Sequence, residues 1–392
     1  MTRGPKSLVS SAMLTKDTQQ ELLIKAGAEA GWLMFLMISG VLSGIVNGQT
    51  GVFSSTTNYT SPQIVRTGFD GADQEGFVSS GGFQPGGHLT TDGNHIYWTN
   101  PVAIKRTHLQ TRVTETVATY PSGSFDPQGI TTDGHHLYIA SVRNPISEYG
   151  LNGQWIRAVG ASTRYITGLV TDGIFIFWSD EEEGLFRMKL DGSEREQIGT
   201  ETSIMGMNGD STHLYWANDR DRLIRRCGLD GSNPETLVNL AEVFGTTLPN
   251  GDRVNYLASG IVVTLTHVYW EILGTYRGIY RCELDGANPV RLTVNGYTGG
   301  ASLTAYPNAL FPEPMQPVRP TLRHDADALT VTLEWPAIAD RRYLLLKSTD
   351  LERFSQAGGL MNCTTTEGLE TLSSPEASAF FIVRKLPGTV SP

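Results

Sequence analysis

Apolar and polar residues alternate in short runs along most of the chain, and the runs recur about every 40 residues. One run reads TTDGNHIYWTN at 90–100, and similar runs follow at 131–141, 170–180, 208–218 and 263–272. In most of them an apolar segment meets an Asp-Gly turn and returns as an alternating segment. This pattern predicts a β-hairpin in each run.

A second alternating run follows each of these hairpins. Residues 185–188 (LFRM) are one example, and the chain then turns at Asp191-Gly192 and returns through residues 196–198. Two hairpins make a four-stranded sheet. A repeat of about 40 residues with four strands is typical of β-propeller blades rather than of a solenoid.

Two further segments each match one half of the repeat. Residues 64–74 (IVRTGFDGADQ) match the second half-repeat at 279–289, and residues 299–311 match the first half-repeat. We therefore expect the N-terminal segment to supply the outer strands of a sixth blade and the C-terminal segment its inner strands. Sharing a blade leaves no open strand edge at the seam. The prediction is an all-β, six-bladed propeller over residues 60–311, closed by a blade shared between the two segments.

The end of the first half-repeat carries a family resemblance. Residues 97–100 (YWTN), 177–180 (FWSD) and 215–218 (YWAN), each followed by a strand end of the R-x-x-L-D-G type, resemble the YWTD repeats of the low-density-lipoprotein-receptor class B propellers. Exported bacterial proteins carry similar propellers. The resemblance covers about residues 60–311 and implies the six-bladed fold. Only Asp180 retains the final Asp of the family motif, and the cysteine-rich modules that flank the animal receptor propellers are absent from this sequence, so a receptor role is not implied.

A proline-rich stretch at 312–320 predicts a stiff linker to a second domain. Beyond it, residues 329–335 (LTVTLEW), 342–350 and 379–386 alternate as strands, which predicts a small β-sandwich over residues 321–387. The pattern resembles the fibronectin-III-like accessory domains of large exported bacterial proteins. That resemblance implies a display, attachment or spacer module.

Residues 1–48 are predicted to be an N-terminal extension with a signal peptide. The uncharged apolar run at 31–46 is shorter than the roughly 20 residues of a membrane span, and Val46-Asn47-Gly48 offers a cleavage site before Gln49. The alternative is an uncleaved signal anchor. In both cases the folded part is expected to be exported, as a secreted, periplasmic or cell-surface protein, with no membrane span in the mature chain if the signal is cleaved.

Charge and cysteine content narrow the classes of partner. Forty acidic and thirty basic residues give a formal charge of −10, which disfavours nucleic acid as a partner. The three cysteines, Cys227, Cys282 and Cys363, are too few for a disulfide framework and are expected to be small buried residues. We expect a monomer that binds a protein or glycan partner.

Two sets of side chains recur at fixed repeat positions. Histidines lie two residues before the central aromatic residue at His95, His136, His213 and His267. Arginines occupy a slot in the second half-repeat at Arg66, Arg106, Arg187, Arg226 and Arg281, with Glu148 in the same slot of one blade. The histidines could form a metal ring and the arginines a polyanion-binding ring. A structural role is favoured for both, because equivalent positions diverge from the propeller axis and because each Arg is expected to pair with a carboxylate such as Asp180 or Asp92, or with a carbonyl.

No catalytic motif stands out. The sequence lacks a G-x-S-x-G elbow, an H-E-x-x-H motif and a P-loop. Calcium-dependent propeller lactonases need converging carboxylates at the axis, where this chain has mostly Gly, Leu, Ile, Met and Thr. We therefore predict no catalytic residues, no metal site and no cofactor, with calcium left open.

A ligand is expected to bind where loops lead into the inner strands and connect the two hairpins, since propellers carry function on such loops. The candidate residues are Phe125, Asp126, Arg164, Tyr165, Glu181, Glu182, Glu183, Asp219, Arg220, Tyr256, Tyr276 and Tyr297. An insertion between Asn239 and Ser259 in the fifth repeat is the expected specificity element. The sequence thus favours a non-catalytic binding propeller. The alternatives are a propeller lyase or lactonase and a structural cell-surface component.

Overall fold

The computed structural model describes residues 50–55, 64–78, 88–120, 126–160, 165–254, 256–293, 302–310, 321–325, 330–336, 341–348, 355–363, 367–373 and 380–389. The predicted signal segment 1–48 and the predicted linker 312–320 lie outside these residues. Among the residues described, no helix has both the length and the apolar character needed to cross a membrane.

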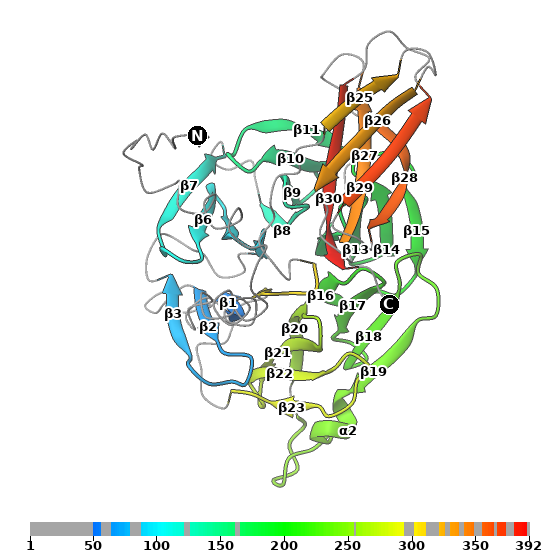
Figure 1. The fold of residues 1–392 in the computed structure, drawn as a ribbon. Coiled ribbons are helices and arrows are strands. Elements are labelled where there is room, and N and C mark those ends of the chain that lie inside the picture. Colours follow the sequence, from blue (N-terminus) through cyan, green and yellow to red (C-terminus); the bar gives the residue numbers. More distant parts are fainter. Residues whose placement is uncertain are drawn as a thin grey trace, which may run out of the picture. The chain divides into compact units, whose positions relative to one another are not determined.

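Six four-stranded antiparallel sheets surround a common centre (Figure 1). Their innermost strands contact one another in a closed ring, β4–β8–β12–β16–β20–β24 and back to β4. From the inner strand outward, blade 1 consists of β4 (Leu89–Thr91), β5 (His95–Asn100), β6 (Ala103–His108) and β7 (Thr114–Thr119). Blade 2 consists of β8 (Pro127–Thr132), β9 (His136–Ser141), β10 (Ile146–Gly150) and β11 (Trp155–Val159). Blade 3 consists of β12 (Ile166–Thr171), β13 (Phe175–Asp180), β14 (Gly184–Lys189) and β15 (Glu196–Gly199). Blade 4 consists of β16 (Ile204–Gly209), β17 (His213–Asn218), β18 (Leu223–Gly228) and β19 (Glu235–Asn239). Blade 5 consists of β20 (Tyr256–Val263), β21 (His267–Gly274), β22 (Gly278–Glu283) and β23 (Val290–Arg291). Blade 6 consists of β24 (Leu303–Tyr306), β1 (Gly51–Ser55), β2 (Ile64–Thr67) and β3 (Glu75–Val78). The all-β, six-bladed propeller predicted from the repeats is confirmed.

Blade 6 combines strands from distant parts of the chain, but the break falls at a different place from the predicted one. The C-terminal segment contributes only the inner strand β24, and β1 pairs with it through Gly51–Tyr306 to Ser54–Leu303. The prediction that the C-terminal segment supplies both inner strands was therefore wrong. Strand β1 is buried along its whole length and lies before residue 60, so it shows no alternation that would reveal it.

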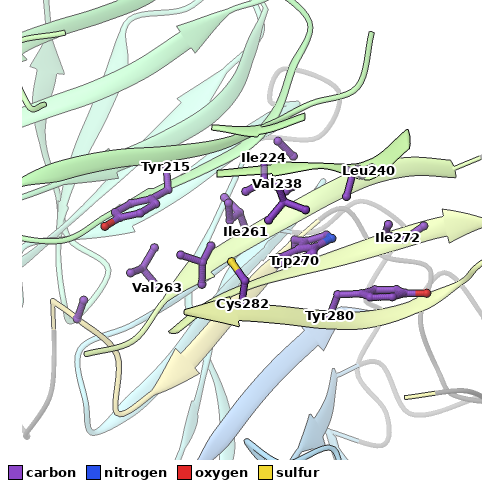
Figure 2. Close-up of a cluster of buried hydrophobic side chains, with 14 of the residues drawn as sticks. Tyr215, Ile224, Val238, Leu240, Ile261, Val263, Trp270, Ile272, Tyr280 and Cys282 are labelled. Atoms are coloured by element: carbon purple, nitrogen blue, oxygen red, sulfur yellow. The ribbon is translucent and has the colours of Figure 1, made fainter. Parts of the chain in front are cut away.

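Adjacent aromatic residues of the repeat fill opposite interfaces between blades. In blade 1, Trp98 packs with Phe53 and Phe77 of blade 6, whereas Tyr97 packs with Leu137 of blade 2. Figure 2 shows the corresponding arrangement at the interface between blades 4 and 5, where Tyr215 of blade 4 and Trp270 of blade 5 belong to one buried cluster. Successive side chains of a strand point to opposite faces, so an aromatic pair joins its blade to both neighbours. Truncating such a fully buried ring costs about 3–5 kcal/mol.

The insertion in blade 5 contains a short helix. Helix α2 (Leu240–Phe244) begins at Asn239, whose side chain accepts a hydrogen bond from the Ala241 N–H, and ends at Gly245. Phe244 stacks on Tyr276 with the ring centroids 5.1 Å apart. The insertion is therefore an ordered extension of the blade 5 core.

Residues beyond the propeller form two three-stranded antiparallel sheets. The first has the order β25 (Thr321–Asp325), β26 (Thr330–Pro336) and β29 (Glu367–Ser373), and the second β28 (Ser355–Cys363), β27 (Arg341–Ser348) and β30 (Phe380–Thr389). Tyr343, Leu345 and Leu386 are buried. The strands predicted at 329–335, 342–350 and 379–386 correspond to β26, β27 and β30.

Candidate functional site

Two groups of loops emerge at the same edge of the propeller. One group joins the second and third strands of each blade, and the other leads into the inner strands. Backbone hydrogen bonds join the two groups of loops. The Val142 N–H donates to the Asp126 carbonyl at 3.2 Å, and the Glu181 N–H donates to the Tyr165 carbonyl at 3.1 Å. Asp219 N–H donates to the Ser203 carbonyl in the same way. These loops form the surface that we call the loop face.

The last position of the YWTD-like motif holds the loop between the second and third strands. Asp180 Oδ1 accepts from the N–H groups of Glu182 and Glu183, and Asn100 Oδ1 accepts from those of Val102 and Ala103. Only an acceptor oxygen is required, so asparagine serves as well as aspartate. This explains why Asn100 and Asn218 can replace the Asp of the family motif.

The structure brings together, on the loop face of consecutive blades, the predicted site residues that it describes. They are Asp126 in blade 2, Tyr165 and Glu181–Glu183 in blade 3, Asp219 and Arg220 in blade 4, and Tyr276 in blade 5. Tyr165 is 45% exposed, and the three glutamates and Arg220 are exposed. Asp219 is half-buried, and burial raises the pKa of its carboxyl group although Arg222 opposes this.

Tyr276 and Tyr256, two aromatic residues of the predicted ligand-binding set, belong to the packing and the strands of blade 5. Tyr276 is half-buried against Phe244, and its carbonyl accepts a hydrogen bond from the Tyr280 hydroxyl at 2.7 Å. Tyr256 begins β20. Phe125, Arg164 and Tyr297 lie outside the described residues.

The repeated histidines lie at the opposite edge, beside the turn between the first and second strands. Nδ1 of His95 is 3.7 Å from Asp92 Oδ2, and Nδ1 of His136 is 3.6 Å from Asp133 Oδ2. Nδ1 of His213 forms a hydrogen bond with the Thr212 hydroxyl. The described residues contain no group of three or more His, Cys, Asp or Glu side chains arranged to hold a metal ion. The contacts support the structural role.

Four of the five repeated arginines join neighbouring blades, and the fifth, Arg66, bonds within blade 6. Arg106 Nε donates to Glu115 in the outer strand of its own blade at 2.6 Å, and its Nη1 donates to the Leu151 carbonyl of blade 2 at 3.0 Å. The same pair of bonds links Arg187 to Glu196 and to the Leu229 carbonyl. The predicted pairing with carboxylates and carbonyls is confirmed, but the carboxylates are glutamates of the outer strands rather than Asp180 or Asp92. The reason is register: Arg106 and Glu115 lie directly opposite on paired strands.

The aspartates at the repeat turns shape the backbone. Asp92 Oδ1 accepts from the N–H groups of Asn94 and His95, and its Oδ2 accepts from the Tyr97 hydroxyl at 3.0 Å. Asp133 and Asp172 accept from their own turns in the same way. Their carboxylates are thus used by the turns.

A small cavity of about 50 Å³ lies at the centre, lined by the inner strands of all six blades. Its polar lining includes Thr90, Thr167, Asn208 and Thr304, and none of the described lining residues is a carboxylate. His88 also lines it, and burial lowers the pKa of this imidazole to about 4. Sequence reasoning missed His88. The available signal was its position in the repeat, four residues before Asp92. The equivalent residues of blades 2 to 5 are Gly129, Gly168, Gly206 and Gly260.

Comparisons with known proteins bear on the fold alone. No protein-family model and no curated protein matches the chain. A solved structure described as a nidogen/laminin complex contains a similar chain, with a TM-score of 0.52 and 15% identity over 65% of this chain and 97% of that one. A putative TolB from Agrobacterium tumefaciens has a TM-score of 0.44 and 14% identity, covering 66% and 99%. At 15% identity, the match to the chain of the nidogen/laminin structure shows the propeller fold alone.

Proposed function

We propose that this chain is an exported, non-catalytic binding propeller that recognises a protein or carbohydrate partner through its loop face. The observation that carries the proposal is the clustering of exposed charged side chains and of Tyr165 on the loops of consecutive blades, above a backbone that side-chain caps hold in place. Such pre-organised loops lose little conformational entropy on binding.

The extent of this surface favours a protein over a carbohydrate. Its residues are spread over four consecutive blades, from Asp126 in blade 2 to the insertion of blade 5. Stable protein interfaces bury roughly 800 Å² per partner, which needs a surface of this breadth. The similar solved chain in the nidogen/laminin structure also comes from an assembly of proteins.

The centre of the propeller supports binding over catalysis. Lyase or lactonase chemistry at the axis needs charged side chains that converge on a substrate. Among the described residues, the cavity of about 50 Å³ is lined by hydroxyl, amide and apolar groups and by the imidazole of His88, which burial keeps neutral at pH 7. Its size suits a few water molecules rather than an organic substrate.

The test measures how well two variants, each with three acidic residues neutralised, capture partner proteins. In the first, Glu181, Glu182 and Glu183 are changed to Gln, which leaves the loop backbone bonded to Asp180. In the matched control, Glu194, Asp230 and Asp285 of turns at the opposite edge become Gln, Asn and Asn. The Asn side chains keep the oxygen acceptor that the Asp230 and Asp285 turns use.

Both variants remove three negative charges, so non-specific electrostatic effects are equal. We expect proteins captured by the immobilised full-length chain from extracellular extracts to be lost with the loop-face variant and kept with the control. Equal capture by the two variants, or no specific capture by the native chain, would contradict the proposal.

A further inference from the structure

A cavity of about 610 Å³ lies between blades 3 and 4, away from the axis. It is lined by the outer strand β15 and the segment that follows it, and by β17 and β18 of blade 4. The volume falls within the range of ligand pockets in proteins, which is roughly 300–1,000 Å³. None of the residues proposed for the loop face lines this cavity.

The position opposite the tryptophan of the second strand is aromatic in blades 3 and 5 and is a cation in blades 1 and 4. In blade 3, Phe186 stacks on Trp178 with the ring centroids 5.4 Å apart, and in blade 5 Tyr280 stacks on Trp270 at 6.0 Å. The corresponding residue opposite Trp216 in blade 4 is Arg225. Its guanidinium lies 5.9 Å from the Trp216 ring centroid and is also bonded to Glu201.

Glu201 orders the polar wall of the cavity. Its carboxylate accepts hydrogen bonds from Trp216 Nε1 at 3.0 Å, from Asn218 Nδ2 at 2.7 Å and from Arg225 Nη1 at 2.5 Å. The side chains of Arg225 and Glu201 are 23% and 17% exposed, so a ligand in the cavity can reach part of this pair, whereas Arg225 Nε is fully covered.

The charges of the lining select the class of ligand. Arg225 opposes a cation, while Glu201 and the exposed Asp221 at the rim oppose an anion. A hydroxyl group both donates and accepts, so it can bond a carboxylate and a guanidinium side by side. Leu185 and Ile198 provide apolar walls for the carbon skeleton of the ligand.

We propose that this cavity is a binding site for a neutral carbohydrate. Arg225 and Asp221 bond the sugar hydroxyls, and Glu201 acts as a positioning residue that holds the guanidinium. This inference goes beyond the proposed function, because a sugar in this cavity needs no protein partner. Glu201 and Asp221 lie in loops of the loop face, but neither is among the residues proposed to bind a partner there.

The experiment measures the binding of glucose, galactose, mannose, maltose and cellobiose to the full-length protein by saturation-transfer NMR and titration calorimetry. Putrescine and succinate represent the cationic and anionic ligand classes. Arg225→Phe reproduces the Phe186–Trp178 stack of blade 3 and should close the cavity without loss of fold. Lys105→Phe makes the matched change over Trp98 in blade 1, where Lys105 Nζ lies 5.2 Å from the ring centroid.

We expect at least one sugar to bind the native protein and the Lys105→Phe control equally, and to bind Arg225→Phe at least tenfold more weakly. Asp221→Ala, an exposed change, should weaken binding several-fold and decides the question if Arg225→Phe does not fold. The proposal is overturned if no sugar binds, if binding is unchanged in both cavity variants, or if putrescine or succinate binds in the cavity instead. The loop-face variant should retain sugar binding, which separates this result from that of the proposed function.

Discussion

At the scale of single residues, His88 stands at a position of the inner ring where blades 2 to 5 carry glycine and blade 6 carries Ser302. Glycine is needed there because the chains approach closely. A Cβ atom at Gly168 would lie 2.6 Å from Met207 Cβ, and one at Gly260 would lie 3.1 Å from Leu303 N. The histidine therefore introduces a titratable group into a tightly packed centre.

His88 should make the stability of the protein depend on pH. Burial lowers its pKa from 6.5 to about 4, so the unfolded chain binds a proton more readily than the folded one. The contribution of neutral, buried His88 to the free energy of unfolding is complete above pH 6.5 and is lost as the pH falls from 6.5 to about 4. We expect His88→Ser, the residue found in blade 6, to reduce the slope of unfolding free energy against pH in this window. Urea denaturation at intervals of half a pH unit measures it, and an unchanged slope would show that His88 does not titrate in this way.

At the scale of strands and blades, blade 2 carries the ion pair between its two outer strands in reverse. Glu148 of β10 lies opposite Arg157 of β11, where the other blades with this pair have Arg opposite Glu. Arg157 still reaches the next blade, since its Nη2 donates to the Leu190 carbonyl at 2.9 Å. The ion pair needs one cation and one carboxylate on the third and outer strands of a blade. Either strand can carry the cation.

This exchange predicts the outcome of a double-mutant cycle. Glu148→Arg and Arg157→Glu each place like charges opposite one another and should destabilise the protein by about 1–3 kcal/mol. The double variant restores the arrangement of Arg106 and Glu115 and should recover most of the loss. Chemical denaturation of the four proteins measures the coupling. Additive losses would mean that the pair contributes nothing through its charges.

At the scale of the whole molecule, the closed ring of inner strands makes the axis a small, neutral cavity. The described lining offers hydroxyl and amide oxygens from residues such as Thr90 and Asn208, and calcium sites usually need carboxylates to compensate the loss of hydration. We therefore expect the full-length protein, dialysed without chelator, to contain less than stoichiometric calcium and transition metal in elemental analysis. A stoichiometric metal content would favour the lyase or lactonase alternative and direct the work to substrate panels.

The sequence by itself determined the blades, their number and the aromatic pairs in the second strands of blades 1, 3, 4 and 5. These features are local, because alternation and turn residues act within a few positions, and six repetitions make a weak signal unambiguous. The position of the break in blade 6 escaped this reasoning, because β1 is buried on both faces and has no alternation to detect.

Only the tertiary structure decided how neighbouring blades are joined and what lies between them. The partners of Arg106, the glycine ring around His88 and the cavity beside Arg225 depend on contacts between segments that are far apart in the sequence. Arg225 looks unremarkable within its own repeat, since blade 1 carries Lys105 at the same position. The space beside Trp216 became visible only in the structure, because blade 3 contributes walls such as Leu185 and Ile198.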